Sequence, residues 1–341
     1  MASVKSVAVR LDALERQIRR HERAHHSEYV IPDSRLGWAI RPFGRHHTFG
    51  YTAGANGFRA IPFAPRAPSS PVKFGFFGDS FIHGDEVSDE DAALAQLQRL
   101  VDGVVINGGV PGYGTDQALM RLERSADALS CTWLFLGIAT CDETRNINIL
   151  RLHHSPVSAI LYMKPRFVNT SAGLRVVYPP PNKRRSLSEH YLDTRTQHFL
   201  KKYDAFYPRS GNIASALSNL FSSGHERISK TGHRQEAGRQ LTLQIVKRFW
   251  QVVSTRKCRG TLVLIPNSMQ LIGSSDLDFY RSAFRQAGYQ FCDLTRAFQM
   301  RDCWRYAHDA LWCTNGHFAP VSSQWVAETL AEYIHTAPPL M

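Results

Sequence analysis

The sequence predicts an α/β protein in which a parallel sheet of about five strands is covered by helices on both faces. From residue 72 onward, short apolar runs alternate with amphipathic stretches of helical period, and this alternation is typical of such a sheet. The chain has 341 residues, of which 43% are hydrophobic. That length is enough to bury one large core or two modest ones.

Five apolar runs have the length of buried strands. They lie at 72–77, 103–106, 132–138, 261–265 and about 289–294. Helical periodicity is found near 90–101, 115–129, 236–256, 277–287 and 319–335. Ligands of doubly wound folds bind at the carboxyl ends of the strands, so the loops that follow the strands are where functional residues are expected.

The rest of the chain divides into an N-terminal part and an insertion. Residues 1–70 are expected to form a helix at 4–24 and an irregular, strand-containing arm that packs on the domain of 71–341. Between about 143 and 235 the strand–helix alternation breaks, and "PRFVNTSAGLRVVYPPPN" suggests a hairpin followed by a proline stop, with short helices after it. The oligomeric state is left open.

The net charge of +12 is concentrated in one segment. Residues 151–260 contain 20 lysines and arginines against 5 aspartates and glutamates, which leaves 21 against 24 elsewhere. A solvated positive face is the simplest interpretation, and an anionic substrate or a membrane surface are alternatives. No helix-turn-helix, zinc-finger or RNP-like motif accompanies the charge, so no nucleic-acid partner is expected.

Location and cofactors are expected from what the sequence lacks. No apolar run reaches the roughly 18 residues of a membrane-spanning helix, and the first residues do not have the pattern of a signal peptide. A cytoplasmic protein is therefore expected. The six cysteines show no CxxC pair and no histidine at zinc-ligand spacing, so we expect free thiols, no metal and no cofactor.

Ser80 ends the first predicted strand in "VKFGFFGDSFIHGD". If a helix begins here, the backbone N–H of Ser80 and the helix dipole face the same space, which favours a nucleophile whose product is an oxyanion. A helix-capping serine is the competing interpretation, and the tripeptide Gly-Asp-Ser alone favours it.

Two further loops change that balance. The loop at 108–114 carries four glycines, so its backbone N–H groups can approach a ligand closely. The lysine of a nucleotide-binding Walker loop is missing from it. His317 directly precedes the last predicted helix. In this topology the loop after the last strand can lie beside the loop after the first, so His317 can reach Ser80.

Four segments together resemble the conserved blocks of SGNH/GDSL hydrolases in order and spacing: "GDSFIHGDEV", "NGGVPGYGTDQ", "LGIATCDETRN" and "NGHFAPVSSQWVAETL". The chain is most similar to a bacterial GDSL-like esterase/acylhydrolase branch that also has an upstream arm, here "RLGWAIRPFGRHHTFGYTAGANGFRA". The resemblance covers roughly residues 30–150 and 260–335. It implies a three-layer, flavodoxin-like SGNH hydrolase fold.

The resemblance implies roles for three residues. Ser80 would be the nucleophile, and His317 its general base and later the acid for the leaving group. The backbone N–H groups of Ser80 and Gly112 would donate hydrogen bonds to the oxyanion.

The third and the last block depart from the family pattern. The family's Asn-Asp pair is Cys141-Asp142 here, and a thiol is a weak donor to an oxyanion. Asn146 or Asn148 could replace the missing amide.

The family also expects an aspartate two or three residues before the histidine. This chain has Thr314 and Asn315 there. Asn315 would hold the imidazole through its carbonyl oxygen, without a charge to stabilise the imidazolium. Asp309 or Asp302 could supply the carboxylate through loop folding.

The expected function is that of a serine esterase or acylhydrolase with an acyl-serine intermediate. Its substrate would be a small acylated molecule or acyl-sugar, whose anionic part would meet the basic segment. An alcohol or sugar acceptor in place of water would make the protein an O-acyltransferase. The alternative is a catalytically impaired SGNH-fold protein that binds or scaffolds, for which Cys141 and Asn315 are the evidence.

Overall fold

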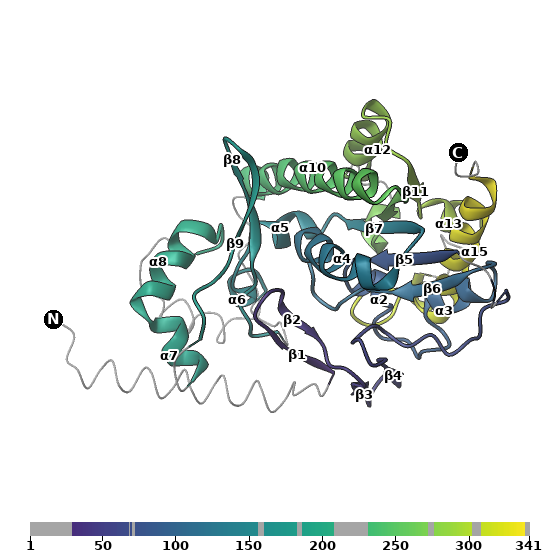
Figure 1. Ribbon diagram of the computed structural model, residues 1–341, viewed down its shortest axis with the longest axis horizontal. Coiled ribbons are helices and arrows are strands. Elements are labelled where there is room, and N and C mark those ends of the chain that lie inside the picture. The colour runs from purple at the N-terminus through teal and green to yellow at the C-terminus, as the bar shows by residue number, and fades with distance from the viewer. Residues whose placement is uncertain are drawn as a thin grey trace. The chain divides into compact units, whose positions relative to one another are not determined.

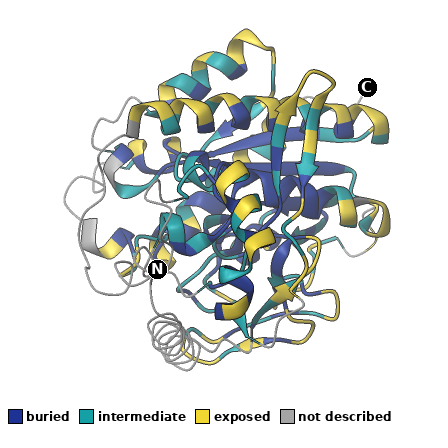
Figure 2. Cartoon of the chain, turned by 90° about the vertical axis from the view of Figure 1, so that its left-hand side faces the viewer, coloured by how far each residue is buried: buried dark blue, intermediate teal, exposed yellow. Residues whose placement is uncertain are grey.

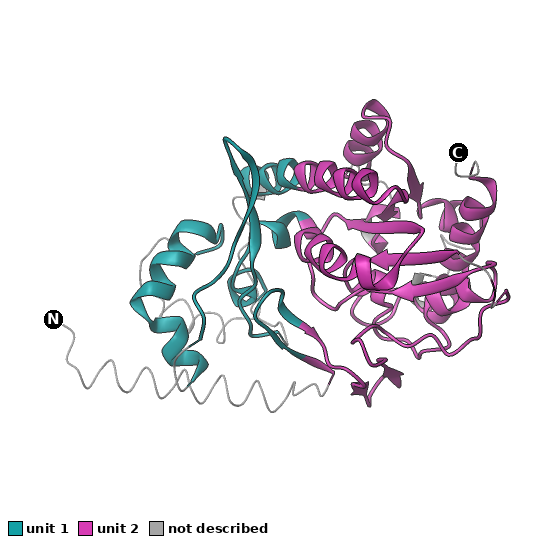
Figure 3. Cartoon of the chain, in the orientation of Figure 1, with its two compact units in different colours: residues 1–27, 31–38, 143–241 teal, residues 28–30, 39–142, 242–341 magenta. Residues whose placement is uncertain are grey.

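A computed structural model describes residues 29–67, 69, 72–155, 160–182, 186–207, 231–271, 276–301 and 308–337. The helix expected at 4–24 and residue Asp302 lie outside these ranges. The chain forms two compact units (Figure 3). Unit 1 contains residues 1–27, 31–38 and 143–241, and unit 2 contains 28–30, 39–142 and 242–341.

Unit 2 is built on the predicted parallel sheet of five strands (Figure 1). The strands are β5 (Lys73–Phe77), β6 (Val104–Asn107), β7 (Trp133–Ala139), β10 (Arg259–Ile265) and β11 (Phe291–Asp293). Their spatial order is β6-β5-β7-β10-β11, which in chain order is the 2-1-3-4-5 arrangement of flavodoxin-like folds. Every predicted strand overlaps one of them, so the predicted α/β fold class is confirmed.

Helices cover the sheet on both sides. Figure 1 shows α4 and α10 on one side and α3 and α15 on the other. The main helices of this unit are α3 (Ala93–Gln98), α4 (Thr115–Leu129), α10 (Thr231–Arg256, of which residues 231–241 belong to unit 1), α12 (Asp276–Gln286) and α15 (Pro320–Thr336). Four short ones are α2 (Ser80–His83), α11 (Ser268–Leu271), α13 (Arg296–Gln299) and α14 (His308–Leu311). The helix predicted at 90–101 is shorter, because the backbone at Ala92 is still extended.

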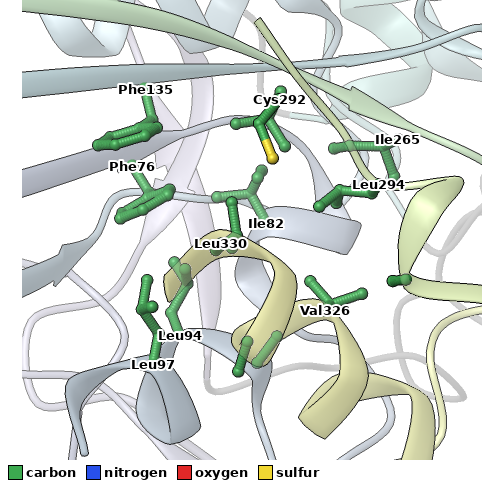
Figure 4. Close-up of a cluster of buried hydrophobic side chains, with 14 of the residues drawn as sticks. Phe76, Ile82, Leu94, Leu97, Phe135, Ile265, Cys292, Leu294, Val326 and Leu330 are labelled. Carbon is green, nitrogen blue, oxygen red and sulfur yellow. The ribbon is translucent and has the colours of Figure 1, made fainter. Parts of the chain in front are cut away.

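The core between the sheet, α3 and α15 is rich in aromatic and aliphatic side chains (Figure 4). Phe76 of β5 and Phe135 of β7 stack with ring centroids 4.2 Å apart. Leu94 and Leu97 reach this layer from α3, and Leu330 from α15. The central strands are buried (Figure 2), which explains why they appear in the sequence as continuous apolar runs.

The arm contributes short strands: β1 (Val30–Asp33) pairs with β2 (Gly37–Ile40), and β3 (Arg45–His46) pairs with β4 (Tyr51–Thr52). Beyond β4, the Arg59 backbone N–H donates to the carbonyl of Asn107 at 3.2 Å. This contact places the end of the arm against β6, the edge strand of the sheet.

Unit 1 contains the predicted hairpin, β8 (Arg166–Thr170) and β9 (Gly173–Val177), which are antiparallel. Its helices are α5 (Asp142–Asn146, whose first residue belongs to unit 2), α6 (Arg151–His154), α7 (Leu187–Leu192) and α8 (Thr194–Tyr203).

Burial would raise the pKa of Asp204, but His153 and the backbone N–H groups bonded to it hold that pKa below its ordinary value. This carboxylate organises the unit's small core.

Within the described residues, no helix combines the length and the apolar character needed to cross a bilayer. Cys131, Cys141, Cys258, Cys292 and Cys313 are free thiols, as the sequence predicts, and Cys303 lies outside the described ranges.

The stacked aromatic layer gives a stability prediction. Phe135 is fully buried, so Phe135→Ala is expected to lower the free energy of unfolding by about 3–5 kcal/mol, measured by urea denaturation. Phe43, which is 77% exposed, provides the control: Phe43→Ala should change it by less than about 0.5 kcal/mol. Equal losses in both variants would contradict this assignment of the core.

Candidate active site

Ser80 is the first residue of α2, directly after β5 and its two-residue link. The side chain of Asp79 accepts a hydrogen bond from the Phe81 backbone N–H at 2.9 Å and caps the helix. The residue that caps the helix is therefore Asp79, and not Ser80 as the competing interpretation of the sequence has it. The Ser80 hydroxyl is available for another contact.

Glycines allow α2 to sit close to the strands. A Cβ atom at Gly78 or at Gly137 would lie within 2.6 Å of the Ile82 side chain, and one at Gly109 would lie 2.3 Å from the His83 backbone nitrogen. Gly109 thus makes room for α2 rather than for a ligand, which corrects the interpretation of that glycine. Gly112 has a φ of 75°, a left-handed conformation that favours glycine.

The central contact of the site joins three side chains. His317 Nε2 lies 2.8 Å from Ser80 Oγ, and His317 Nδ1 lies 2.7 Å from Glu86 Oε2. His317 belongs to a tight loop before α15, in which its carbonyl accepts a hydrogen bond from the Cys313 N–H. The topology thus brings the loops after the first and last strands together, as the sequence predicts for Ser80 and His317.

The carboxylate decides the tautomer of His317. A carboxylate accepts hydrogen bonds, so the proton of the neutral imidazole lies on Nδ1 and points to Glu86. Nε2 then carries the lone pair that faces the Ser80 hydroxyl. The side chains of Glu86 and His317 are 5% and 16% exposed, so the carboxylate is shielded while the imidazole reaches the surface.

Asn315 does not have the predicted role. Its side-chain amide donates to Glu86 Oε1 at 2.8 Å, and its backbone N–H donates to the same oxygen at 3.0 Å. The group that faces Nδ1 of His317 is Glu86, because the turn after α2 carries this carboxylate to the imidazole. Asn315 orients the carboxylate. The backbone of Asp309 lies in α14, and its side chain is outside the described part of the structure.

Sequence reasoning missed Glu86. The signal was the pair of acids in "HGDEV", five and six residues after Ser80. Glu86 has a φ of 70°, which is rare for a residue other than glycine, and nothing in the sequence marks this turn.

The Cys141-Asp142 pair follows β7 and lies beside the helix cap. Cys141 Sγ is 3.9 Å from Asp79 Oδ2. Asp142 is buried and accepts a hydrogen bond from Thr115 Oγ1 at 3.2 Å. Ligand atoms of Asp79, Cys141 and Asp142 lie within 4.8 Å of one another. Both carboxylates already serve the protein, one as a helix cap and one as the acceptor of Thr115.

The two asparagines considered as substitutes for the missing amide belong to unit 1. The Asn148 side-chain amide donates to the Leu150 carbonyl at 2.9 Å and to both oxygens of Asp204. The Asn148 amide therefore donates to groups of unit 1, and its role at the oxyanion stays a prediction. Asn146 is fully buried at the end of α5.

A second histidine–carboxylate pair lies in the same segment. His83 Nδ1 is 2.6 Å from Asp85 Oδ1, and His83 Nε2 is 2.8 Å from the Tyr29 hydroxyl. Burial lowers the pKa of His83 from its ordinary value of 6.5 to about 4, although Asp85 acts in the opposite direction. His83 is therefore neutral near pH 7.

No protein-family model and no curated protein sequence matches this chain. Among solved structures, it is similar to a member of the lipolytic protein G-D-S-L family from Veillonella parvula DSM 2008, at 10% identity and a TM-score of 0.42, over 78% of this chain and 100% of that one. It is also similar to a lipase/acylhydrolase from Enterococcus faecalis, at 13% identity and a TM-score of 0.37, over 77% and 95% of the two chains.

A third similar structure is the psychrotrophic esterase EstA from Pseudoalteromonas sp., at 12% identity and a TM-score of 0.39, over 77% of this chain and 96% of that one. The order of the five strands defines the fold of unit 2, and the contacts of His317 with Ser80 and Glu86 define the site.

The buried His83 gives a pH-dependent stability. Its folded pKa is below its unfolded value, so the unfolded chain binds more protons between pH 6.5 and 4, and the free energy of unfolding falls as the pH drops through this window. The groups that face His83 are Asp85, Tyr29, Tyr51, Arg59 and Asp89.

The free energy of unfolding is measured by urea titration at several pH values. Between pH 6.5 and 4 it should fall by up to about 3 kcal/mol less in His83→Gln than in wild type. The exposed His335 supplies the control, since His335→Gln should keep the wild-type slope. If His83→Gln has the same pH dependence of the free energy of unfolding as wild type, the pKa of His83 is not lowered in the folded protein.

Proposed function

We propose that this protein is a serine hydrolase that cleaves esters through an acyl intermediate on Ser80. The observation that carries the proposal is the chain of contacts from Ser80 through His317 to Glu86, with heavy-atom distances of 2.8 and 2.7 Å. A nucleophile, a base within hydrogen-bond reach and a third group that orients the base are the parts that nucleophilic catalysis requires.

The proposed reaction has two steps. His317 Nε2 takes the proton of the Ser80 hydroxyl while Oγ attacks the ester carbonyl carbon. The imidazolium then returns that proton to the leaving alcohol as the C–O bond breaks. Water repeats the sequence on the acyl-serine and releases the acid. Glu86 keeps Nδ1 protonated and stabilises the imidazolium charge in both steps.

The oxyanion would be held mainly by backbone groups. Within the described residues, no group accepts a hydrogen bond from the Ser80 N–H, as expected for the first N–H of a helix. The resemblance adds the N–H of Gly112 and places Cys141 where the family has an amide. Losing one such donor can cost about 10²–10³ in turnover, so activated esters are the expected substrates.

The acceptor and the substrate belong to the same proposal. A small acylated molecule or acyl-sugar is the substrate class that the family resemblance suggests, and an alcohol in place of water would make the protein an O-acyltransferase. The charge of residues 151–260 favours an anionic group on the substrate. The alternative function is a binding protein without turnover. Cys141 still favours it, whereas Asn315 no longer does, because Glu86 contacts the imidazole.

The nucleophile is tested with a fluorophosphonate probe, which reacts with activated serines. We expect Ser80 to be the labelled residue, identified by peptide mass spectrometry, and Ser80→Ala to lose labelling and at least about 10³-fold in kcat on an activated ester. The exposed Ser130 is the control, and Ser130→Ala should behave as wild type. If Ser80 stays unlabelled, and Ser80→Ala retains wild-type hydrolysis, the binding-protein alternative replaces the proposal.

The carboxylate is tested by Glu86→Gln. The amide keeps the size of the side chain and removes its charge, so kcat should fall by about 10²–10⁴ with little change in KM. Glu90 is an exposed acid in the same segment, and Glu90→Gln should leave both constants unchanged.

Asn315→Asp separates this arrangement from the one that the family pattern predicts. If residue 315 held the imidazole, the aspartate would raise kcat. Since the Asn315 amide lies 2.8 Å from Glu86 Oε1, the new carboxylate would instead face another carboxylate, and kcat should fall. A rise in kcat would assign the third role to position 315 and remove it from Glu86.

A further inference from the structure

We infer that Arg59, a residue of the N-terminal arm, is the positioning residue that holds the Glu86 turn in contact with His317. The inference rests on the proposed function for its catalytic consequence. Arg59 is 3% exposed and does not touch Ser80, His317 or Glu86 side chains through any contact that the structure describes.

The Nη1 and Nη2 donors of the guanidinium point at the backbone on either side of Glu86. Nη1 donates to the carbonyls of His83, at 2.9 Å, and Gly84, and Nη2 donates to those of Val87 and Ser88, both at 2.8 Å. These four carbonyls flank Glu86 on both sides in the chain. One side chain therefore fixes the backbone before and after the catalytic carboxylate.

The segment needs such a partner for two reasons. α2 has a single turn, and its carbonyls at the carboxyl end have no partners within the helix. Glu86 also adopts a left-handed φ of 70°, which costs energy for a residue with a Cβ atom and persists only where surrounding contacts impose it. The guanidinium supplies donors to the carbonyls and imposes the turn.

Arg59 is itself held in place. Its Nε donates to Asp89 Oδ1 at 3.2 Å, and Asp89 Oδ2 accepts hydrogen bonds from the backbone and hydroxyl of Thr52. The guanidinium carbon lies 4.7 Å from the centre of the Tyr51 ring. The Arg59 backbone is bonded to Asn107 at the end of β6. Through Arg59, the position of the turn that carries Glu86 is therefore fixed relative to the sheet.

Lysine cannot take over this role. Its ammonium is a compact charge with three donors, whereas the planar guanidinium offers five donors in a fixed fork. Arg59→Lys keeps the charge beside Asp89 but cannot bond both sides of the turn. It is therefore the variant that separates positioning from charge.

The test is a double-mutant cycle on ester hydrolysis with Arg59→Lys, Glu86→Gln and the combination. If Arg59 acts through Glu86, Arg59→Lys should lower kcat at least tenfold in the wild-type background with KM nearly unchanged, and less than threefold in the Glu86→Gln background. Equal losses in the two backgrounds would mean that Arg59 only stabilises the fold, and would overturn the inference.

Arg121 of α4 is the matched control. It is also a buried arginine bound to the arm, donating to the Gly57 carbonyl at 2.7 Å with its guanidinium 4.6 Å from the Phe58 ring. It makes no described contact with the Glu86 turn. Arg121→Lys should give the same kcat ratio with and without Glu86→Gln.

A readout independent of turnover keeps the inference separate from the proposed function. The amide protons of Gly84 and Asp85 both bond to the Ser80 carbonyl. Their hydrogen exchange should be at least tenfold faster in Arg59→Lys and unchanged in Arg121→Lys. If wild type is not labelled at Ser80, the proposed function fails and exchange still tests Arg59; unchanged exchange in Arg59→Lys overturns the inference.

If Arg59→Lys does not yield folded protein, Asp89→Asn is the milder variant. It removes the ion-pair partner of Arg59 and leaves the guanidinium present. The same non-additivity with Glu86→Gln is expected at a smaller amplitude, and additive losses would again overturn the inference.

Discussion

The close packing of the one-turn helix α2 against the sheet is the constraint on which the rest of the site depends. Ile82 occupies the space left by glycines 78 and 137, and the backbone at His83 occupies the space left by Gly109. A helix of four residues gains little stability from its own hydrogen bonds. Packing against the strands therefore fixes where Ser80 lies, and the turn that follows must start from that fixed point.

The helix α2 and the turn after it contribute to two histidine–carboxylate pairs, His83 with Asp85 and His317 with Glu86. The two pairs differ in burial, and their chemistry differs for that reason. A carboxylate oxygen lies 2.6 Å from Nδ1 in the His83 pair and 2.7 Å from it in the His317 pair, and a hydroxyl oxygen lies 2.8 Å from Nε2 in both, but the Asp85 contact lacks hydrogen-bond geometry. His83 is sealed against the arm by Tyr29 and stays neutral because of its burial. His317 keeps a side chain that is 16% exposed, beside the buried Ser80. The sealed pair holds the structure, while the open pair has the geometry for proton transfer.

The sequence predicted the strands well because each is buried on both faces and so appears as a continuous apolar run, as in 132–138. The contact between Ser80 and His317 could also be predicted, because parallel strands place the loops that follow them at one edge of the sheet. It failed at Glu86 and Asn315. Which carboxylate reaches the imidazole depends on a left-handed turn at Glu86 and on two hydrogen bonds from Asn315, and neither leaves a periodic signal in the sequence.

The arm explains why that turn can exist without a glycine at position 86. A left-handed glutamate is tolerated where fixed contacts outweigh its cost, and these contacts come from Arg59, more than 20 residues upstream in the chain. The arginine is buried, which is affordable because Asp89 and four carbonyls satisfy it. A carboxylate held from the arm, rather than supplied by the histidine's own loop, frees the sequence before His317 from the need for an acid. Thr314 and Asn315 can stand there for that reason, because Glu86 contacts Nδ1 of His317 in place of an acid from that loop.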